Sequence, residues 1–246
     1  MARHFFLDRG TIEHGRAVIS GDEARHIRTV LRRGAGDAIR LVDEDGCEYR
    51  AVITACSARC IEVALLEKHP PPAPASRSVI LAQAITRFQT MDYIVQKATE
   101  LGVSAIAPFT GVRSAGRLRV EQLQLKRLRW QKIAREATKQ CGRRAVPPVH
   151  TVRSFQEIVR SSRDNQLKII LWEDEKNTVL REVIRGSAKQ HSMVLVGPEG
   201  GFTEQEIALA RQGGFHAVSI ARQILRTETA ALYVLSVLHY EWESFP

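Results

Sequence analysis

Three glycines, a proline and a glutamate form the run Gly197-Pro198-Glu199-Gly200-Gly201, the clearest candidate for a ligand site. The run lies between an apolar segment and a capped helix, so it predicts a tight loop whose backbone can approach a ligand closely. It lacks the Lys-Ser/Thr pair of a phosphate-binding P-loop, and the chain has no GxGxxG dinucleotide fingerprint. A neutral or cationic ligand therefore suits this loop better than a phosphate, although structural turns of similar composition are as common.

A second candidate set lies further along the chain, in Ile224-Leu225-Arg226-Thr227-Glu228-Thr229-Ala230-Ala231. This run follows a predicted strand and opens a predicted helix over 230–242. Loops that join strand to helix at the carboxyl edge of an open α/β sheet form its ligand crevice. Arg226 and Glu228 would present a cation and a carboxylate there, and either threonine would cap the helix. A surface ion pair beside a helix cap is the plainer interpretation of the same residues.

The positive charge of the chain is concentrated in one segment. The 246 residues include 36 Lys and Arg against 27 Asp and Glu, a formal charge of +9. Residues 1–70 are electrically balanced, whereas residues 111–150 hold 11 basic and two acidic residues. An apolar stripe that begins at Trp130 predicts a helix fixed through one face, with its cations facing out. Such a face suggests a polyanionic partner, most commonly nucleic acid, with a solvated helix face as the alternative.

A smaller set of arginines lies near the start of the chain. Arg25, Arg28 and Arg32 recur at i, i+3 and i+7 on a helix predicted over 22–33, so they would share one side of it. Arg3 would lie near them if the first strand pairs beside that helix. Contacts to nucleotide bases could arise here, although a solvated arginine face explains the pattern equally well.

The run Pro70-Pro71-Pro72-Ala73-Pro74 predicts a stiff linker, because each proline removes a backbone donor and restrains its neighbour. It divides the chain into domains of residues 1–70 and 71–246. Before it, short strands and one helix predict a small barrel, with Asp45-Gly46 as a hairpin turn. The strands are expected over 4–8, 16–20, 38–42, 48–54 and 60–66.

After the linker, strands alternate with helices, which predicts a largely parallel α/β sheet. The strands are apolar throughout, as strands buried on both faces are. Thr203 and Glu206 predict the capping box of one helix, and another is expected over 91–101, ending at Gly102. The strands are expected over 79–84, 104–108, 168–172, 193–197 and 216–220.

Several classes of protein are disfavoured by composition. The apolar fraction of 44% is that of a folded globular chain. No stretch approaches the roughly 20 apolar residues of a membrane helix, and residues 1–6 lack the apolar run of a signal peptide. The four cysteines and eight histidines show no metal-ligand spacing, so we predict no metal site. A cytoplasmic location is the expectation.

Several sequence blocks together resemble one family, the bacterial RsmE enzymes. These are SPOUT-class methyltransferases that methylate N3 of a uridine in small-subunit (16S) ribosomal RNA. GPEGGF followed about twenty residues later by ILRTETA is far more specific than either piece alone. The matching blocks keep the family's order over nearly the whole chain: Arg3 to Phe6, His26 to Arg28 with Val30 to Arg32, Met91-Asp92, Gln96 to Val103, Arg113-Ser114, Trp130 with Glu136-Ala137, Gln140 to Arg143, Gly197 to Phe202, and Ile224 to Ala231.

The resemblance implies a fold, a cofactor and partners. The fold is a PUA-like RNA-binding β-barrel over 1–70, followed by an α/β methyltransferase domain over 71–246 whose chain is threaded into a trefoil knot. S-adenosylmethionine is the implied methyl donor, without a metal. The implied partners are ribosomal RNA within the small ribosomal subunit and a second copy of the chain. The residues expected to hold the cofactor are Leu171, Trp172, Glu173, Gly197, Pro198, Glu199, Gly200, Gly201, Ile220, Ala221, Leu225 and Thr227. Those expected to contact RNA are Arg3, Arg25, Arg28, Arg32, Arg113, Lys126, Arg129, Lys132 and Arg143.

One departure from the family concerns the cofactor loop. Where the family has Leu-Gly-x-Arg, this chain has Ile220-Ala221-Arg222-Gln223. The alanine adds a methyl group where the backbone would approach the adenosine, and Arg222 is the candidate to replace the missing arginine.

The expected chemistry is a direct displacement at a sulfonium, which requires alignment of the reactants and stabilisation of the acceptor anion. Glu228 is the expected general base or orienting carboxylate, and Arg226 is expected to hold the uracil or a phosphate. One alternative is a non-catalytic RNA-binding or ribosome assembly factor on the same fold, which has lost cofactor binding through Ala221 and Gln223. Another is a SPOUT methyltransferase with a different RNA target.

Overall fold

The structure, a computed structural model, describes residues 4–7, 12–71, 73, 77–114, 119–164 and 166–242. Arg3, expected to contact RNA, lies outside these residues. The chain divides into two compact units, the first comprising Met1–Ala75 and Thr138–Val146, the second Ser76–Ala137 and Pro147–Pro246. The predicted division at residue 70 would place residues 138–146 in the second domain, whereas in the structure this segment groups with the first unit. Ion pairs of Lys139 with Glu23 and of Arg144 with Glu48 explain the grouping.

The first unit is built on a mixed, curled sheet of six strands in the order β1-β4-β5-β6-β3-β2. Its core follows from alternation: β3 buries every second side chain, as a half-buried strand does, and β4 does the same up to Leu41 and then also buries Val42. Gly46 takes a positive φ of 82° in the turn between β4 and β5, which pair antiparallel as expected. The strands are β1 (His4–Phe6), β2 (Ile12–Glu13), β3 (Arg16–Ser20), β4 (Ala38–Val42), β5 (Glu48–Cys56) and β6 (Cys60–His69).

The helix expected over 22–33 differs in the structure. It is a short α-helix, α1 (Gly21–Arg25), followed by a π-helical turn, His26–Val30, in which the Leu31 N–H donates to the His26 carbonyl. A π turn is wider than an α turn, so it rotates the later residues away from the expected face. Arg32 lies beyond the turn with a positive φ of 53°. The prediction that the three arginines share one side of a regular helix is therefore wrong.

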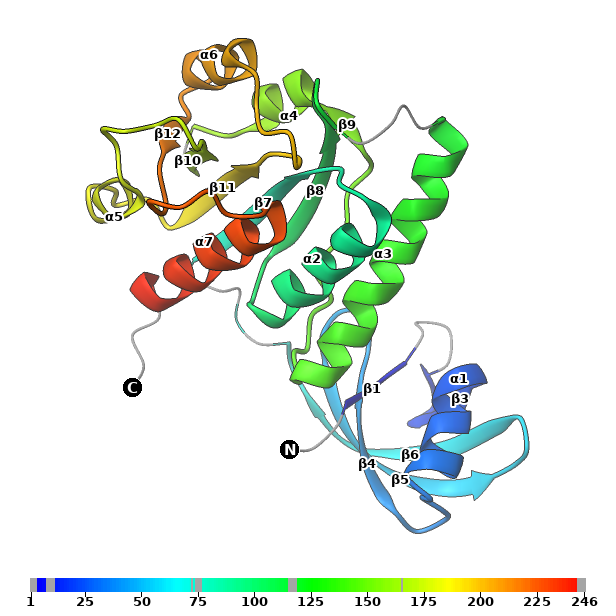
Figure 1. The fold of residues 1–246 in the computed structure, drawn as a ribbon. Coiled ribbons are helices and arrows are strands. Elements are labelled where there is room, and N and C mark those ends of the chain that lie inside the picture. Colours follow the sequence, from blue (N-terminus) through cyan, green and yellow to red (C-terminus); the bar gives the residue numbers. More distant parts are fainter. Residues whose placement is uncertain are drawn as a thin grey trace. The chain divides into compact units, whose positions relative to one another are not determined.

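The second unit contains a parallel sheet in the order β12-β10-β11-β7-β8-β9 (Figure 1). All five pairs of neighbouring strands are parallel, as the strand–helix alternation predicts. The central strands are buried along most of their length. The strands are β7 (Ser78–Ala84), β8 (Ala105–Thr110), β9 (Arg153–Ser154), β10 (Gln166–Leu171), β11 (His191–Val196) and β12 (His216–Val218).

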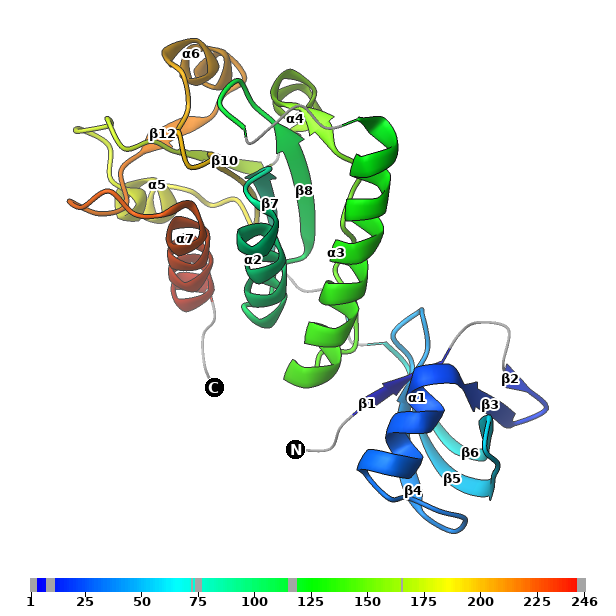
Figure 2. The same ribbon diagram turned by 45° about the vertical axis from the view of Figure 1, so that its right-hand side comes forward.

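Helices cover both faces of this sheet (Figures 1 and 2). α2 (Phe88–Glu100) and α7 (Thr227–Trp242) pack against each other on one face, and α4 (Phe155–Ser161) and α6 (Glu204–Gln212) on the other. The capping box of α6 forms as predicted, since the Thr203 hydroxyl accepts from the Glu206 N–H. α3 (Val120–Cys141) and α5 (Leu180–Arg185) complete the unit, with the last residues of α3 grouped with the first unit. None of the helices in the described ranges is long and apolar enough to cross a membrane.

Candidate active site

A cavity of about 620 Å³ opens at the carboxyl ends of β10, β11 and β12. Because β10 lies between β12 and β11, the loops that follow these three strands meet at one edge of the sheet. Each residue expected to hold the cofactor lines this cavity except Gly200, and Arg226 and Glu228 line it too. The two most specific sequence blocks, separated by more than twenty residues, therefore line the same cavity.

A buried hydrogen-bond network joins two of these loops beneath the cavity. The Thr227 hydroxyl donates to the Gly197 carbonyl at 2.6 Å and accepts from Gln83 Nε2 at 3.0 Å. Gln83 lies near the end of β7 and is fully buried; its amide also donates to the Ala84 carbonyl at 3.2 Å. Thr227, one of the two threonines expected to cap α7, is instead its first residue and holds the glycine loop in place.

The glycine loop is close-packed on both sides. A Cβ at Gly201, whose φ is +68°, would collide with the Glu173 carboxylate, and a Cβ at Gly200 would lie 3.2 Å from Cβ of Arg113. The Arg113 guanidinium donates to the Gly200 carbonyl at 2.9 Å. Arg113, expected to contact RNA, therefore supports the loop from outside the cavity.

The third loop presents open backbone. Among the described residues, none accepts a hydrogen bond from the backbone N–H groups of residues 220–226. The loop is anchored at its ends instead, by the Ser219 N–H donating to the Thr178 carbonyl and by the Ala230 N–H donating to the Arg226 carbonyl. Backbone donors without a protein partner beside a cavity are available to a ligand.

The first loop is held by a carboxylate and a cation. Glu175 is buried; it accepts from the N–H groups of Asn177 and Thr178 and pairs with Arg211 at 2.8 Å. These interactions, the Asn177 N–H foremost, hold the pKa of Glu175 below its usual value. The Arg211 guanidinium lies 5.3 Å from the ring centre of Trp172, which lines the cavity. The loop is thus positioned before any ligand arrives.

Charges of both signs surround the cavity. Three arginines, Arg87, Arg222 and Arg226, are exposed on its lining. Glu228 is half-buried in the first turn of α7, and Glu199 accepts from the Arg87 N–H at 3.2 Å. The site can therefore bind a cation through its carboxylates and an anion through its arginines.

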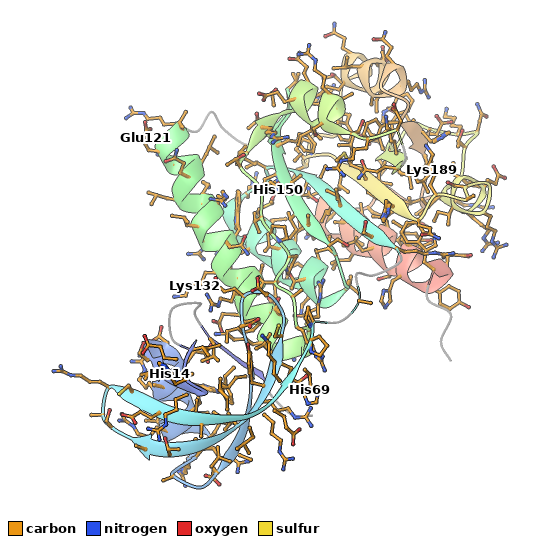
Figure 3. All side chains as sticks on the ribbon, turned by 180° about the vertical axis from the view of Figure 1, so that it is seen from behind. His14, His69, Glu121, Lys132, His150 and Lys189 are labelled. Atoms are coloured by element: carbon orange, nitrogen blue, oxygen red, sulfur yellow. The ribbon has the colours of Figure 1, made fainter. Side chains whose placement is uncertain are left out.

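The remaining cations expected to contact RNA lie outside the cavity and differ in their availability. Lys132 is exposed on α3 (Figure 3) and Arg32 is exposed after the π turn. Arg129 pairs with Asp92 at 2.6 Å, Arg25 pairs with Asp22 at 2.7 Å, and Arg28 donates to the Ser57 carbonyl. Burial lowers the pKa of Lys126 and of Arg143, both of which are half-buried. Lys132 and Arg32 are therefore the most accessible of the set.

Sequence reasoning missed part of the site. Gln83 carries no motif and lies in an otherwise apolar strand, and Arg87 and Thr90 come from the start of α2. A polar residue in a strand predicted to be buried on both faces was the available signal for Gln83, because such a side chain requires partners. No group of histidines, cysteines and carboxylates suitable for a metal occurs in the part of the chain that the structure describes.

Comparisons with known proteins agree with this geometry. The model of the family "RNA methyltransferase domain" matches residues 73–239, and that of "RNA methyltransferase PUA domain" matches residues 19–63. Ribosomal RNA small subunit methyltransferase E of Bacillus subtilis is 33% identical, over 99% of this chain and 98% of the relative. The crystal structure of ribosomal RNA small subunit methyltransferase E from Neisseria gonorrhoeae, bound to S-adenosyl methionine, is 30% identical and superposes with a TM-score of 0.88 over the full length of both chains.

A structure from Legionella pneumophila, described as a putative methyltransferase in complex with its cofactor SAM, is 26% identical, with a TM-score of 0.81 over 98% of each chain. Both the sequence matches and the structural matches extend over the two units. The chain belongs to the ribosomal RNA small subunit methyltransferase E family of RNA methyltransferases.

Proposed function

We propose that this protein transfers a methyl group from S-adenosylmethionine to N3 of a uridine in small-subunit (16S) ribosomal RNA, giving 3-methyluridine. The observation that carries the proposal is the cavity at which the three loops meet, in a chain of this family. The Neisseria gonorrhoeae relative, which this chain matches over its full length, is bound to S-adenosyl methionine.

The residues present fit this cofactor. The cavity volume of about 620 Å³ lies within the range of small-molecule sites, roughly 300–1,000 Å³. Leu171, Ile220 and Leu225 offer apolar walls for an adenine, and the open N–H groups of residues 220–226 offer donors to its ring nitrogens. A sulfonium cation suits a lining that contains carboxylates. Ala221 lines the cavity without filling it, so the family's missing glycine is compatible with binding.

The cofactor would supply an electrophilic methyl group, and the protein has to prepare the nucleophile. Uridine N3 carries a proton at neutral pH, and Glu228 is the half-buried carboxylate on the cavity wall that can accept it. Arg226, exposed beside it, can hold the uracil oxygens as negative charge develops, or an adjacent phosphate. N3 lies on the Watson–Crick edge, so the uridine has to be unpaired or extruded to reach this site.

Methylation of purified small ribosomal subunits with labelled cofactor, followed by identification of the modified nucleoside, tests the activity. Glu228→Gln should reduce turnover about 100-fold or more, the usual range for loss of a general base, with little change in cofactor affinity. Glu204→Gln is the matched control, because Glu204 is also a first-turn helix glutamate but does not line the cavity. Near-normal turnover of Glu228→Gln would exclude it as the base.

A non-catalytic assembly factor is the competing function, and calorimetry separates the two. The proposed enzyme should release or absorb heat on binding S-adenosylmethionine, whereas a factor that has lost the cofactor site should not. If the labelled methyl group were found on another nucleoside and no 3-methyluridine formed, the enzyme would have a different RNA target on the same fold.

We also propose that both units contact RNA, with α3 supplying much of the phosphate attraction. Exposed cations of α3 such as Lys132 support this. Three cations of the basic segment 111–150, Lys139, Arg143 and Arg144, belong to the first unit. The positive charge of that segment is therefore divided between the two units, and not confined to the part after the linker. Deleting the first unit would remove the partners of 138–146, so single substitutions on the intact chain are the cleaner test.

A homodimer is the remaining part of the proposal. A shallow apolar cavity on α2 and α7 is lined by Tyr93, Tyr233 and Tyr240, which are 44%, 43% and 76% exposed. Glu228 also lines it, so a second copy seated there would border the catalytic carboxylate. Sedimentation of Tyr233→Glu should show a monomer if this face joins two copies, and an unchanged dimer would place the interface elsewhere. We further propose the knotted threading and the cytoplasmic location that the resemblance implies.

A further inference from the structure

A second cavity, of about 430 Å³, lies at the amino ends of the strands in the second unit, the edge opposite to the candidate active site. Its floor follows from the strand register. Gln166, His191 and Ser78 are the first residues of β10, β11 and β7 and lie side by side. His191 Nδ1 and the Ser78 hydroxyl oxygen are 2.8 Å apart. The walls are His150, Thr151 and Arg153, in the segment that pairs with β8, and the end of α4.

The charge of this cavity is positive. Arg153 and Arg163 line it, and neither guanidinium has a hydrogen bond or an ion pair with a described residue. No aspartate or glutamate lines the cavity in the described part of the chain. His150, labelled in Figure 3, also lines it; partial burial, and then the neighbouring arginines, lower its pKa.

The helix end beside the cavity does not oppose an anion strongly. Carbonyl groups at the C-terminal end of a helix carry partial negative charge. Here two of them accept hydrogen bonds from hydroxyls, Ile158 from Ser161 at 2.8 Å and Val159 from Ser162 at 2.7 Å. Glu157, whose pKa is lowered in part by Arg153, does not line the cavity, so the two guanidinium groups set the charge of its lining.

Apolar side chains complete the lining: Ile80, Ala107, Ile158 and Met193. Ala107, Ile158 and Met193 are buried in the core and Ile80 is half-buried, so this wall is firmly packed. The cavity of about 430 Å³ has the size of a small-molecule site, so an anion carried on an organic body would fill it better than a free inorganic anion. The planar fork of a guanidinium matches phosphate oxygens in pairs.

We propose that this cavity binds a phosphate ester of nucleotide size, with Arg153 and Arg163 on the phosphate and the apolar wall against the organic part. The ester could belong to a free nucleotide or to an RNA strand, since the recognised chemistry is the same. The site is independent of the methyl-transfer site, so its failure would leave the proposed function untouched.

Cytidine 5′-monophosphate and a single-stranded hexacytidylate are suitable probes, because neither contains the adenosine of the cofactor or a uridine. Binding to the full-length protein is followed through the NMR signals of the His150 and His191 imidazoles. We compare the wild type with the double variant Arg153→Gln/Arg163→Gln. Arg160→Gln is the matched control, since Arg160 is exposed on α4 but does not line the cavity.

We expect at least one probe to shift both imidazole signals, the double variant to weaken its affinity at least tenfold, and the control to stay within twofold. Affinity for S-adenosylmethionine should be unchanged in each variant, which verifies the fold. Tighter binding of the oligonucleotide would identify an RNA strand as the source of the phosphate ester. Binding of the mononucleotide alone would identify a free nucleotide as the source. Unshifted signals in the wild type, or equal affinity in the double variant, would overturn the proposal. If the double variant does not fold, Arg153→Lys and Arg163→Lys, which keep the charge but lose the fork, should each weaken binding.

Discussion

Replacing Thr227 by valine removes one hydroxyl that links two loops of the candidate active site. The change keeps the side-chain shape but abolishes the 2.6 Å bond to the Gly197 carbonyl and the 3.0 Å bond from Gln83. The Gly197 carbonyl then retains only a 3.5 Å contact with Gln83, whose amide keeps its 3.2 Å bond to Ala84. Leaving a buried polar group without its partner costs about 1–3 kcal/mol, so we expect the unfolding free energy to fall by about 2 kcal/mol.

The same change should loosen the glycine loop relative to the start of α7. Since about 1.4 kcal/mol corresponds to a tenfold change in affinity, a loss of about 2 kcal/mol should weaken binding of S-adenosylmethionine by up to roughly 30-fold. Calorimetry measures the affinity, and urea unfolding measures the stability. Thr227→Ser should restore both, and Thr229→Val, at an exposed position two residues further on, should change neither. If Thr227→Val bound the cofactor within twofold of the wild type and unfolded at the same urea concentration, the network would not position the loops.

Three further outcomes follow from the described contacts. Glu175→Gln should lower the thermal unfolding midpoint at pH 7. The pKa of Glu175 is depressed, so its stabilisation is present above the usual glutamate pKa and is lost as the pH falls through the depressed value. The gap between wild type and variant should therefore narrow as the pH is lowered below the usual glutamate pKa. Gly201→Ala should lower the unfolding free energy, measured by urea titration, by about 1 kcal/mol because alanine disfavours the positive φ at this position. Displacement of the Glu173 carboxylate by the new Cβ should lower it further. Lys132→Ala should weaken RNA binding and lower the slope of log affinity against log salt by about 0.7–0.9, the value for one phosphate contact; an unchanged slope would mean that Lys132 makes no such contact.

The secondary structure of the first unit could be predicted closely where its determinants are local. The strands expected over 16–20 and 38–42 have those bounds, because alternating burial and turn residues act within a few positions. The helix predicted over 22–33 differs from the structure in its second half, where a π turn replaces the α-helix. Ala24 and Ile27 are both buried, which fits an α-helical spacing, but nothing local announced the π turn that follows.

Short elements of the second unit were also missed. α4 and α5 have seven and six residues, too few for a clear helical period, and β9 has two. Such elements form because the sheet and its neighbours offer a surface to pack on, so their stability is tertiary.

The sequence by itself determined the kinds of groups at the site: a glycine loop, an arginine and a glutamate in one run, and a family resemblance that the comparisons confirmed. Only the tertiary structure decided which of them meet. Gln83 supports two loops more than a hundred residues away, and Arg113, which is expected to contact RNA, donates to a carbonyl of the glycine loop. The reason is physical: residue type and spacing specify local backbone and chemistry, whereas hydrogen bonds across the sheet depend on the order in which distant strands are placed side by side.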